Sequence, residues 1–329
     1  MKKNRPLKIV FIGRYSEGSN GIVRSIFMGL NELGHVIHEI NVSERPNLLI
    51  NRYNLKGGNG PIYIKWNLVE LEIKMFKPDI ILFCAGGLTF EPPIINILKR
   101  KCTIVGITLS DPDVFPYTKK YVHLFDYHTT NSMVALKMYK QNGFKNTVLL
   151  PFAIDSRFFV PRPVNPSYKS DISIIGHFRA NRLQIAQRLL KEFNTKIYGR
   201  NWPISSNEPV HGESWFEAAY STKFLINFPK TGKSFINVKV GVFEAIATGR
   251  LLFTEYFSEM EHYYKYGKEL IGYKGEDDLI NKIQYYLDNP SEAESIAKAG
   301  QLRTATEHTW SIRLKKFLDG IQLSPYRKW

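Results

Sequence analysis

Short apolar runs alternate with longer amphipathic segments along the first half of the chain. Runs that are apolar throughout and rich in Val, Ile and Leu, separated by segments of helical period, are typical of a parallel sheet covered by helices on both faces. The predicted strands are 7–13, 35–42, 79–85, 102–108, 127–130 and 146–151. The predicted helices are 21–33, 64–76, 91–101, 117–124 and 132–142.

A proline-rich connector interrupts this alternation, because four of the 17 prolines fall within residues 151–166. The alternation then restarts, so we expect an α/β protein with two Rossmann-like doubly wound domains, 1–155 and 156–308, and a last helical segment, 309–329. Such sheets bind ligands at the carboxyl ends of their strands, and two of them facing each other form a cleft. The second set of predicted strands is 171–176, 195–200, 223–228, 250–255 and 269–274. The second set of predicted helices is 180–193, 213–221, 237–248, 258–266, 277–288, 291–307 and 309–322.

The net charge of the chain limits the classes of binding partner but does not select one of them. The chain of 329 residues has 45 Lys and Arg against 30 Asp and Glu, a net charge of +15 that is spread over both halves. A basic protein favours anionic partners such as nucleotide phosphates, acidic polymers, nucleic acid or a membrane surface. No stripe of arginines and aromatic residues is present, which argues against dedicated nucleic-acid binding.

Cysteine content and apolar run lengths indicate a cytoplasmic protein. Cys84 and Cys102 lie in apolar strand-like runs, so we expect buried free thiols and neither a disulfide framework nor a cysteine zinc cluster. The longest apolar stretches, such as 80–90, are well short of the ~20 residues of a membrane span. The basic start resembles a signal peptide, but its apolar run is short and no cleavage site follows.

The segment KVGVFEAIATG, 239–249, contains one acidic residue in an otherwise apolar helix. A carboxylate at Glu244 is costly to bury without a partner, so it either meets a ligand hydroxyl or a cation in the cleft or faces water at its rim. Lys239 falls in the first turn, where the helix dipole disfavours a cation unless an anion binds beside it. Asn237 is a candidate cap for this helix. A solvated lysine is the alternative.

Two further turns after predicted strands are candidate anion sites. In SIIGHFRANR, 173–182, Gly176 ends a strand, and Arg179 and Arg182 share one face of the following helix, an arrangement suited to a diphosphate or simply to a solvated surface. The loop 13–21 follows the first strand, and its glycines, starting with Gly13, allow close approach to a phosphate or sugar. Their spacing differs from G-x-G-x-x-G, which argues against a dinucleotide-binding dehydrogenase.

Other motifs are weaker. NFPKTGKS, 227–234, ends like a P-loop but lacks the first glycine. The pair Asp111 and Asp113 is spaced as in a metal-binding Asp-x-Asp, yet Pro112 between them is equally a turn device. The histidines show no His-x-x-x-His spacing, so we expect neither a zinc site nor any other bound metal.

Several of these segments together resemble one family. They resemble the CgeB/YkvP-like glycosyltransferases. The matching segments are the stretch from 239 through TGRLLFTEYF, the later IAKAG and HTWSIR segments, 171–182, IYGRNWP at 197–203 and LLPFAID at 149–155. The resemblance implies the GT-B fold, with a nucleotide sugar in the C-terminal domain, the acceptor in the N-terminal domain and a last helix that crosses back. It also implies that Glu244 contacts the donor ribose and that Gly199 belongs to the donor site. Ile236 stands where many relatives have a second glutamate.

The expected activity is therefore glycosyl transfer from a nucleotide sugar to an unidentified protein, glycan or other cell-surface precursor, without metal or cofactor. The leaving diphosphate would be stabilised by Arg179, Arg182 and Lys239. An inverting enzyme also needs a base, for which Asp111 is the candidate. Two alternatives stay open: a non-catalytic basic protein of GT-B shape that binds nucleic acid or an anionic polymer, and a sugar-nucleotide epimerase. Peripheral contact with anionic surfaces is compatible with the charge.

Overall fold

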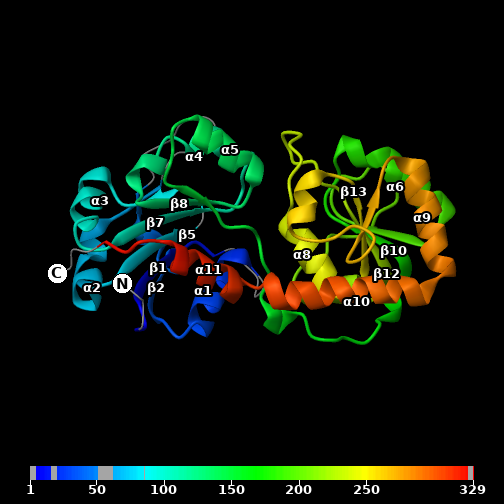
Figure 1. Ribbon diagram of the computed structural model, residues 1–329, viewed down its shortest axis with the longest axis horizontal. Coiled ribbons are helices and arrows are strands. Elements are labelled where there is room, and N and C mark those ends of the chain that lie inside the picture. Colours follow the sequence, from blue (N-terminus) through cyan, green and yellow to red (C-terminus); the bar gives the residue numbers. More distant parts are fainter. Residues whose placement is uncertain (1–4, 16–20, 51–61, 85, 325–328) are drawn as a thin grey trace. The chain divides into compact units, whose positions relative to one another are not determined.

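The computed structural model describes residues 5–15, 21–50, 62–84, 86–324 and 329, and it divides into two compact units. The first unit contains residues 1–152 and 310–329, and the second contains residues 153–309. The divisions predicted from the sequence lie after residues 155 and 308. Each unit is an α/β sandwich built on its own parallel sheet (Figure 1).

The first unit has a six-stranded sheet in the order β2-β1-β5-β7-β8-β9, and every neighbouring pair is parallel. Its central strands are buried on both faces, which explains why they are apolar throughout. The strands are β1 (Lys8–Gly13), β2 (Val36–Asn41), β5 (Ile80–Cys84), β7 (Thr103–Thr108), β8 (Tyr127–Thr130) and β9 (Thr147–Leu149).

Helices cover both faces of this sheet (Figure 1). The helix α11 (Trp310–Gly320) returns to the first unit and packs on α1 (Ile22–Glu32), where a Cβ on Gly29 would lie 2.7 Å from the Trp310 Cβ. Glycine at this position therefore allows the two helices to approach closely. The other helices of this unit are α2 (Glu70–Phe76), α3 (Pro92–Leu98), α4 (Phe115–Thr118), α5 (Met133–Gln141) and the 3-10 turns η1 (Pro46–Leu48), η2 (Trp66–Leu68) and η3 (Val122–Leu124).

A small second sheet in this unit was not expected from the sequence. It has the order β3-β4-β6, and its strands are two or three residues long. Segments this short do not carry a readable alternation of polar and apolar residues. The strands are β3 (Leu49–Ile50), β4 (Ile62–Ile64) and β6 (Leu88–Thr89).

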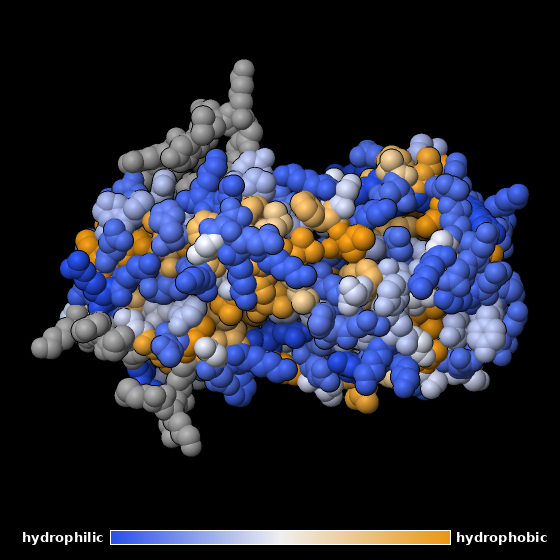
Figure 2. Space-filling model, turned by 45° about the horizontal axis from the view of Figure 1, so that its top comes forward, coloured by the Kyte–Doolittle hydropathy of each residue, from blue (hydrophilic) through white to orange (hydrophobic). Residues whose placement is uncertain are grey.

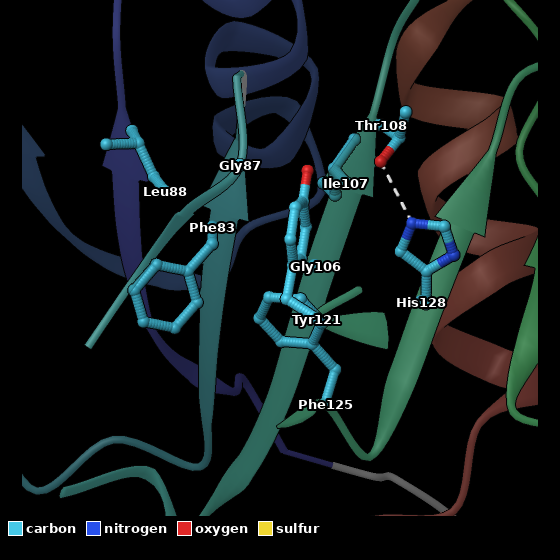
Figure 3. A pocket seen from close by; sticks show the side chains of 9 residues that line it. All are labelled: Phe83, Gly87, Leu88, Gly106, Ile107, Thr108, Tyr121, Phe125 and His128. Atoms are coloured by element: carbon cyan, nitrogen blue, oxygen red, sulfur yellow. Dashed lines mark hydrogen bonds between the residues drawn. The ribbon is translucent and has the colours of Figure 1, made fainter. Parts of the chain in front are cut away.

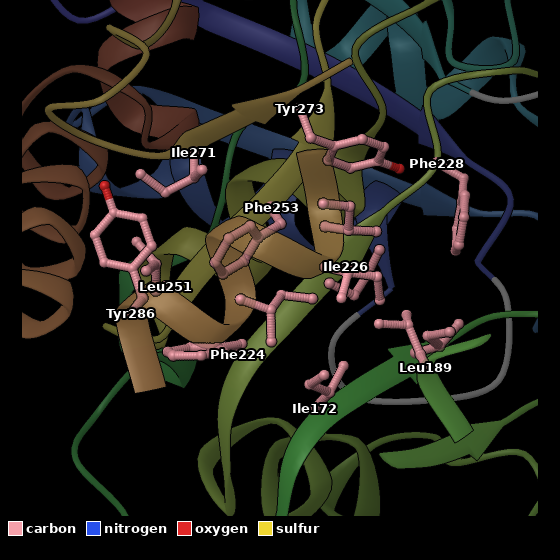
Figure 4. Packing of buried hydrophobic residues seen from close by; sticks show 14 of the residues in the cluster. Ile172, Leu189, Phe224, Ile226, Phe228, Leu251, Phe253, Ile271, Tyr273 and Tyr286 are labelled. Atoms are coloured by element: carbon pink, nitrogen blue, oxygen red, sulfur yellow. The ribbon is translucent and has the colours of Figure 1, made fainter. Parts of the chain in front are cut away.

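The second unit has a five-stranded parallel sheet in the order β11-β10-β12-β13-β14. Buried aromatic and aliphatic side chains from its strands and helices form one core, in which Phe224, Phe253 and Tyr286 lie among branched aliphatic residues (Figure 4). The strands are β10 (Ser170–Ile175), β11 (Thr195–Tyr198), β12 (Thr222–Asn227), β13 (Leu251–Glu255) and β14 (Ile271–Tyr273).

The helices of the second unit follow the predicted segments, with three differences. The segment 237–248 becomes helical only at Val240, and the segment 258–266 forms only a 3-10 turn, η7 (Ser258–His262). The segment 180–193 becomes α-helical only at Leu183, so the prediction that Arg179 and Arg182 share a face of this helix is wrong. The helices are α6 (Leu183–Glu192), α7 (Glu213–Tyr220), α8 (Val240–Ala247), α9 (Glu276–Asp288) and α10 (Pro290–Glu307). The remaining 3-10 turns are η4 (Ser156–Phe158), η5 (Pro166–Tyr168) and η6 (Ala180–Arg182).

The predicted fold class is confirmed. Every strand predicted from the sequence is present, and its ends lie within two residues of the prediction. Hydrophilic residues cover most of the face shown in Figure 2. Among the described residues, no helix combines the length and the apolar character needed to cross a lipid bilayer.

Candidate functional site

The strand order of the second unit changes direction at the carboxyl ends of β10 and β12. Along the chain, β10 is followed by β11 on one side of it and then by β12 on its other side. The two connections leave the sheet in opposite directions at this point, which is where open α/β sheets bind their ligands. The loops after β10 and β12 carry most of the donor-binding residues predicted from the sequence.

Two glycines allow the loops after β10 and β11 to touch. A Cβ on Gly199 would lie 2.1 Å from the carbonyl oxygen of Gly176, a distance that backbone atoms cannot tolerate. The same carbonyl accepts a hydrogen bond from Trp202 Nε1 at 3.0 Å, and the Gly176 N–H donates to the Tyr198 carbonyl at 2.8 Å. Close backbone packing therefore accounts for glycine at 199, and ligand contact by these two glycines stays a prediction.

The substitution Gly199→Ala is expected to destabilise the second unit by about 1–3 kcal/mol, as overpacking typically does. The added methyl group meets the Gly176 backbone, which cannot move without breaking its hydrogen bonds. Gly241→Ala is the matched control, because nothing lies within 4 Å of a Cβ at that helical position. Alanine should raise stability there by about 0.5–1 kcal/mol. Urea unfolding of both variants measures the difference, and equal midpoints would contradict the close approach.

Arg182 lies between β10 and α6 and has no acidic partner among the described residues. Its Nη1 donates to the His177 carbonyl at 2.7 Å, and its guanidinium lies 5.2 Å from the centre of the Phe228 ring. Its Nε is buried and makes no hydrogen bond with any described residue. Burial and the neighbouring charge of Arg179 lower the pKa of Arg182 to about 10. The site therefore contains a desolvated cation whose charge an anion would stabilise.

Arg179 adds a second positive charge beside it. Its side chain is exposed, and it makes no hydrogen bond or ion pair with any residue that the structure describes. Two guanidinium groups close together repel each other, and this repulsion adds to burial in lowering the pKa of Arg182. A polyanion that contacts both guanidinium groups would offset the repulsion between them. A diphosphate, which the sequence predicts as the ligand here, is such a polyanion.

The loop 228–239 is a hairpin and not a phosphate-binding loop. Lys230 pairs with Ile236 in an antiparallel bridge, and the Thr231 N–H donates to the Phe235 carbonyl at 2.7 Å. No helix follows Ser234 directly, as a P-loop requires, since the next described helix begins at Val240. The P-loop-like motif is therefore coincidental.

Lys239 occupies the position just before α8. It is the N-cap residue, so the prediction that Asn237 caps this helix is wrong, and Asn237 is instead buried in the hairpin base. The ammonium group of Lys239 donates to the carbonyls of Phe228 and Lys230, both at 2.6 Å. This lysine therefore ties the hairpin to the helix start and brings positive charge to the same edge of the sheet as Arg182.

Glu244 lies one turn into α8, on the face that it shares with Val240 and Gly241. The helix buries its opposite face against the sheet and α10, whereas these three residues are partly accessible. Glu244 makes no hydrogen bond or ion pair with any described residue, and loss of solvation raises the pKa of its carboxyl to about 7. The space beside Gly241 is open, since no atom would lie within 4 Å of a Cβ at that position. A carboxylate in this setting is suited to accept hydrogen bonds from ligand hydroxyl groups.

In the first unit, Asp111 lies beyond the end of β7 and is 3% exposed. Its carboxylate accepts hydrogen bonds from Thr130 Oγ1 at 2.6 Å and from the Tyr139 hydroxyl at 3.4 Å. Its backbone N–H donates to Asn131 Oδ1 at 3.1 Å. Burial raises the pKa of Asp111 to about 6, against the opposing effect of the two hydroxyls. A general base must reach the proton of a bound acceptor, so the catalytic role of this buried carboxyl stays a prediction.

Gly13 ends β1, and a Cβ there would lie 2.9 Å from the rings of both Phe11 and Tyr15. Aromatic packing thus accounts for this glycine, and the residues 16–20 of the same loop lie outside the described part of the chain. Both cysteines are buried, and neither forms a disulfide. Within the described ranges, no group of three or more His, Cys, Asp or Glu side chains could hold a metal ion.

Phe228 and Trp202 were not singled out from the sequence, although both organise this site. The Arg182 guanidinium lies over the Phe228 ring, and Trp202 donates a hydrogen bond to the Gly176 carbonyl. Little in the sequence marks either residue as part of a site. Each is a single aromatic residue just after a strand, and aromatic residues are common in this chain, at 13%. Arg182 could be predicted from the sequence, because a cation at a strand-to-helix turn is unusual unless an anion binds there.

Comparison with known proteins finds similar sequences and similar folds. Residues 179–319 match a family described as glycosyl transferase-like. The chain is 22% identical over 291 residues to the spore protein CgeB of Bacillus subtilis strain 168, covering 77% of this chain and 86% of that protein.

Solved structures of similar fold include an α-glucosyltransferase in complex with UDP-glucose and DNA containing an abasic site, with a TM-score of 0.63 and 10% identity, covering 96% of this chain and 99% of that one. HepE of Anabaena in complex with UDP and glucose has a TM-score of 0.58 and 11% identity, covering 96% of this chain and all of that one. These likenesses establish the fold.

Proposed function

We propose that this chain, which has the GT-B fold and is similar to the CgeB protein and to a glycosyl transferase-like family, transfers a sugar from a nucleotide-sugar donor, bound by its second unit, to a hydroxyl-bearing acceptor bound by its first unit. The proposal includes a metal-independent reaction. UDP-sugars are the donors to test first, since the structural relatives HepE and the α-glucosyltransferase were solved with UDP or UDP-glucose.

One observation carries this proposal: the second unit holds uncompensated charges of both signs at one edge of its sheet. Arg179 and Arg182 lack acidic partners among the described residues, and the Glu244 carboxylate lacks any hydrogen-bond donor there. A nucleoside diphosphate has the complementary groups, with anionic phosphates at one end and ribose hydroxyls in the middle. Binding would satisfy the cations and the carboxylate together.

The chemistry of glycosyl transfer explains why cations are needed there. As the bond between the sugar and the diphosphate breaks, negative charge grows on the leaving oxygen. Preorganised donors near that oxygen lower the barrier because they need no rearrangement. Arg182 is preorganised by its hydrogen bond to the His177 carbonyl and by the Phe228 ring. The first turn of α8, which has no side-chain cap, supplies further backbone N–H groups.

The test compares UDP with uridine in the Arg182→Ala variant. We expect UDP affinity to fall by about tenfold to a hundredfold, the equivalent of ~1.5–3 kcal/mol for a charged hydrogen bond. Uridine affinity should hardly change, because uridine lacks the phosphates. Isothermal titration calorimetry of both ligands, with Arg179→Ala in parallel, measures the two losses.

Arg188→Ala is the matched control, because Arg188 lies on α6 and already pairs with Glu192 and Asp277. It should bind both ligands like the wild-type protein. Equal weakening of UDP and uridine in Arg182→Ala would place the arginine elsewhere. Absence of UDP binding to the wild-type protein, with no nucleotide diphosphate replacing it, would overturn the proposed donor site.

A further inference from the structure

The helices α2 and α3 cover the same face of the first unit's sheet. Ile81 on β5 and Ile104 on β7 are register partners, so their side chains point to one side of the sheet. Both helices bury their inner sides against these residues in a single apolar cluster. Figure 3 shows Phe83 and Phe125, which belong to this cluster. The outer sides of α2 and α3 therefore point away from the same face of the sheet.

The outer side of α2 is apolar although it is exposed. Leu71 and Met75 lie one turn apart and are 70% and 72% exposed, the highest values for large hydrophobic side chains in the described part of the chain. With Leu68 of η2, which is 40% exposed, they form an apolar strip. On the outer side of α3, Ile97 is 54% exposed. Single exposed apolar residues are common, whereas grouped ones mark an interaction surface.

The ends of these two helices carry positive charge. The two acidic side chains of α2 are already paired, one with Lys74 and the other with Arg45. Lys77 at the end of α2 and Arg100 just after α3 are exposed, and neither has an acidic partner among the residues that the structure describes. The outer side of this helix pair therefore combines apolar side chains with uncompensated cations.

The first unit as a whole is strongly basic. It contains 25 Lys and Arg against 12 Asp and Glu, a net charge of +13, whereas the second unit contains 20 against 18, a net charge of +2. The even division of charge along the sequence does not hold for the folded units, because residues 310–329 belong to the first unit and add four positive charges to it. A partner of this unit is therefore expected to be anionic.

We propose that the outer sides of η2, α2 and α3 dock on an anionic lipid surface. The apolar strip would enter the boundary between headgroups and acyl chains, as the apolar face of an interfacial helix does. Lys77 and Arg100 would lie beside the anionic headgroups. An acidic polymer in solution would need the cations but not the exposed Leu and Met side chains, so the lipid surface is favoured. The predicted donor residues belong to the second unit, and this docking surface does not depend on them.

Flotation of the full chain with lipid vesicles tests the proposal. We expect binding to vesicles of equal parts phosphatidylglycerol and phosphatidylcholine, and much weaker binding to phosphatidylcholine alone. The double variant Leu71→Ser/Met75→Ser should bind the anionic vesicles about tenfold to a hundredfold more weakly, because two side chains lose their apolar burial. Lys77→Gln should bind them about fivefold more weakly, because it loses one cation near the charged surface.

Leu302→Ser is the matched control, because Leu302 is 66% exposed on α10 of the nearly neutral second unit. It should bind vesicles like the wild-type protein. All the replaced side chains are exposed, so urea unfolding midpoints should stay unchanged, which separates lost binding from lost folding.

Equal binding to both kinds of vesicle would overturn the inference. So would wild-type binding by Leu71→Ser/Met75→Ser, and if Lys77→Gln were weakened in that case, the surface would suit an acidic polymer instead. Sedimentation velocity of the same double variant tests a second copy as the occupant. A dimer that dissociates in this variant would show that the apolar strip is covered by another chain, and it would equally overturn the inference.

Discussion

Replacing Glu244 by Gln should weaken UDP binding by about tenfold to a hundredfold while stabilising the ligand-free protein at pH 8. The binding loss follows from removing a charged acceptor of ribose hydroxyl bonds, which is worth about 1.5–3 kcal/mol. The stability gain follows from the absence of any hydrogen-bond donor to this carboxylate among the described residues. Calorimetric titration and urea unfolding of the same variant measure both effects.

The raised pKa of Glu244 determines at which pH the substitution Glu244→Gln stabilises the folded protein. The pKa of Glu244 is raised to about 7 by desolvation, so the folded state holds its proton more tightly than the unfolded state. The stabilising contribution of the protonated form is complete below the unfolded pKa of about 4.3 and is lost as the pH rises through 7. The advantage of Glu244→Gln should therefore be absent near pH 4 and reach about 2–3 kcal/mol at pH 8.

Binding of UDP to the wild-type protein should strengthen from pH 6 to pH 8, because only the ionised Glu244 accepts hydrogen bonds at both of its oxygens. The Gln variant should lack this dependence beyond the part due to ionisation of the phosphates. Glu294→Gln is the control, since Glu294 is exposed and pairs with Lys298 on the surface of α10. Normal UDP affinity in Glu244→Gln would remove this residue from the donor site.

Asp111→Asn should raise the free energy of unfolding of the first unit by up to about 3 kcal/mol at pH 8 and leave it unchanged at pH 4. Asp111 is 3% exposed, and burial raises its pKa to about 6. The stability due to its protonated form is present below a pH of about 4 and is lost as the pH rises through 6. An amide at this position stays neutral, and the hydroxyls of Thr130 and Tyr139 can still bond to it.

The measurement is urea unfolding, followed by near-ultraviolet signals of the first unit, from pH 4 to pH 8. Thr130→Val serves as the comparison, because it removes the 2.6 Å hydrogen bond to Asp111 and should destabilise at every pH. If Asp111→Asn is instead destabilising at pH 8, the carboxylate is compensated by interactions beyond these two hydroxyls. Loss of transfer activity in a stable Asp111→Asn variant would support the predicted base.

Glu244 and Asp111 both have a raised pKa, but they differ in their hydrogen-bond partners. Both lie near the carboxyl ends of parallel strands, where ligands bind. Asp111 is held by two hydroxyls, whereas Glu244 has no described partner and faces open space beside Gly241. Similar raised pKa values thus arise in different settings, and of these two carboxyl groups Glu244 is the one left in need of a ligand.

The sequence alone was sufficient for the two main parallel sheets and for the charged residues of the candidate donor site. Strands buried on both faces must be apolar throughout, so runs such as 80–84 and 103–108 were readable as strands without any tertiary information. Glu244 was predicted because it is a carboxylate in an otherwise apolar helix, and Arg182 because arginines at a strand-to-helix turn suit a diphosphate.

Only the tertiary structure decided which groups have partners, because partners come from segments far apart in the chain. Gly199 packs against the Gly176 backbone of the neighbouring loop, and Lys239 donates hydrogen bonds to two carbonyls of the hairpin. Local periodicity reports burial, but it cannot report which distant atom lies within hydrogen-bonding distance.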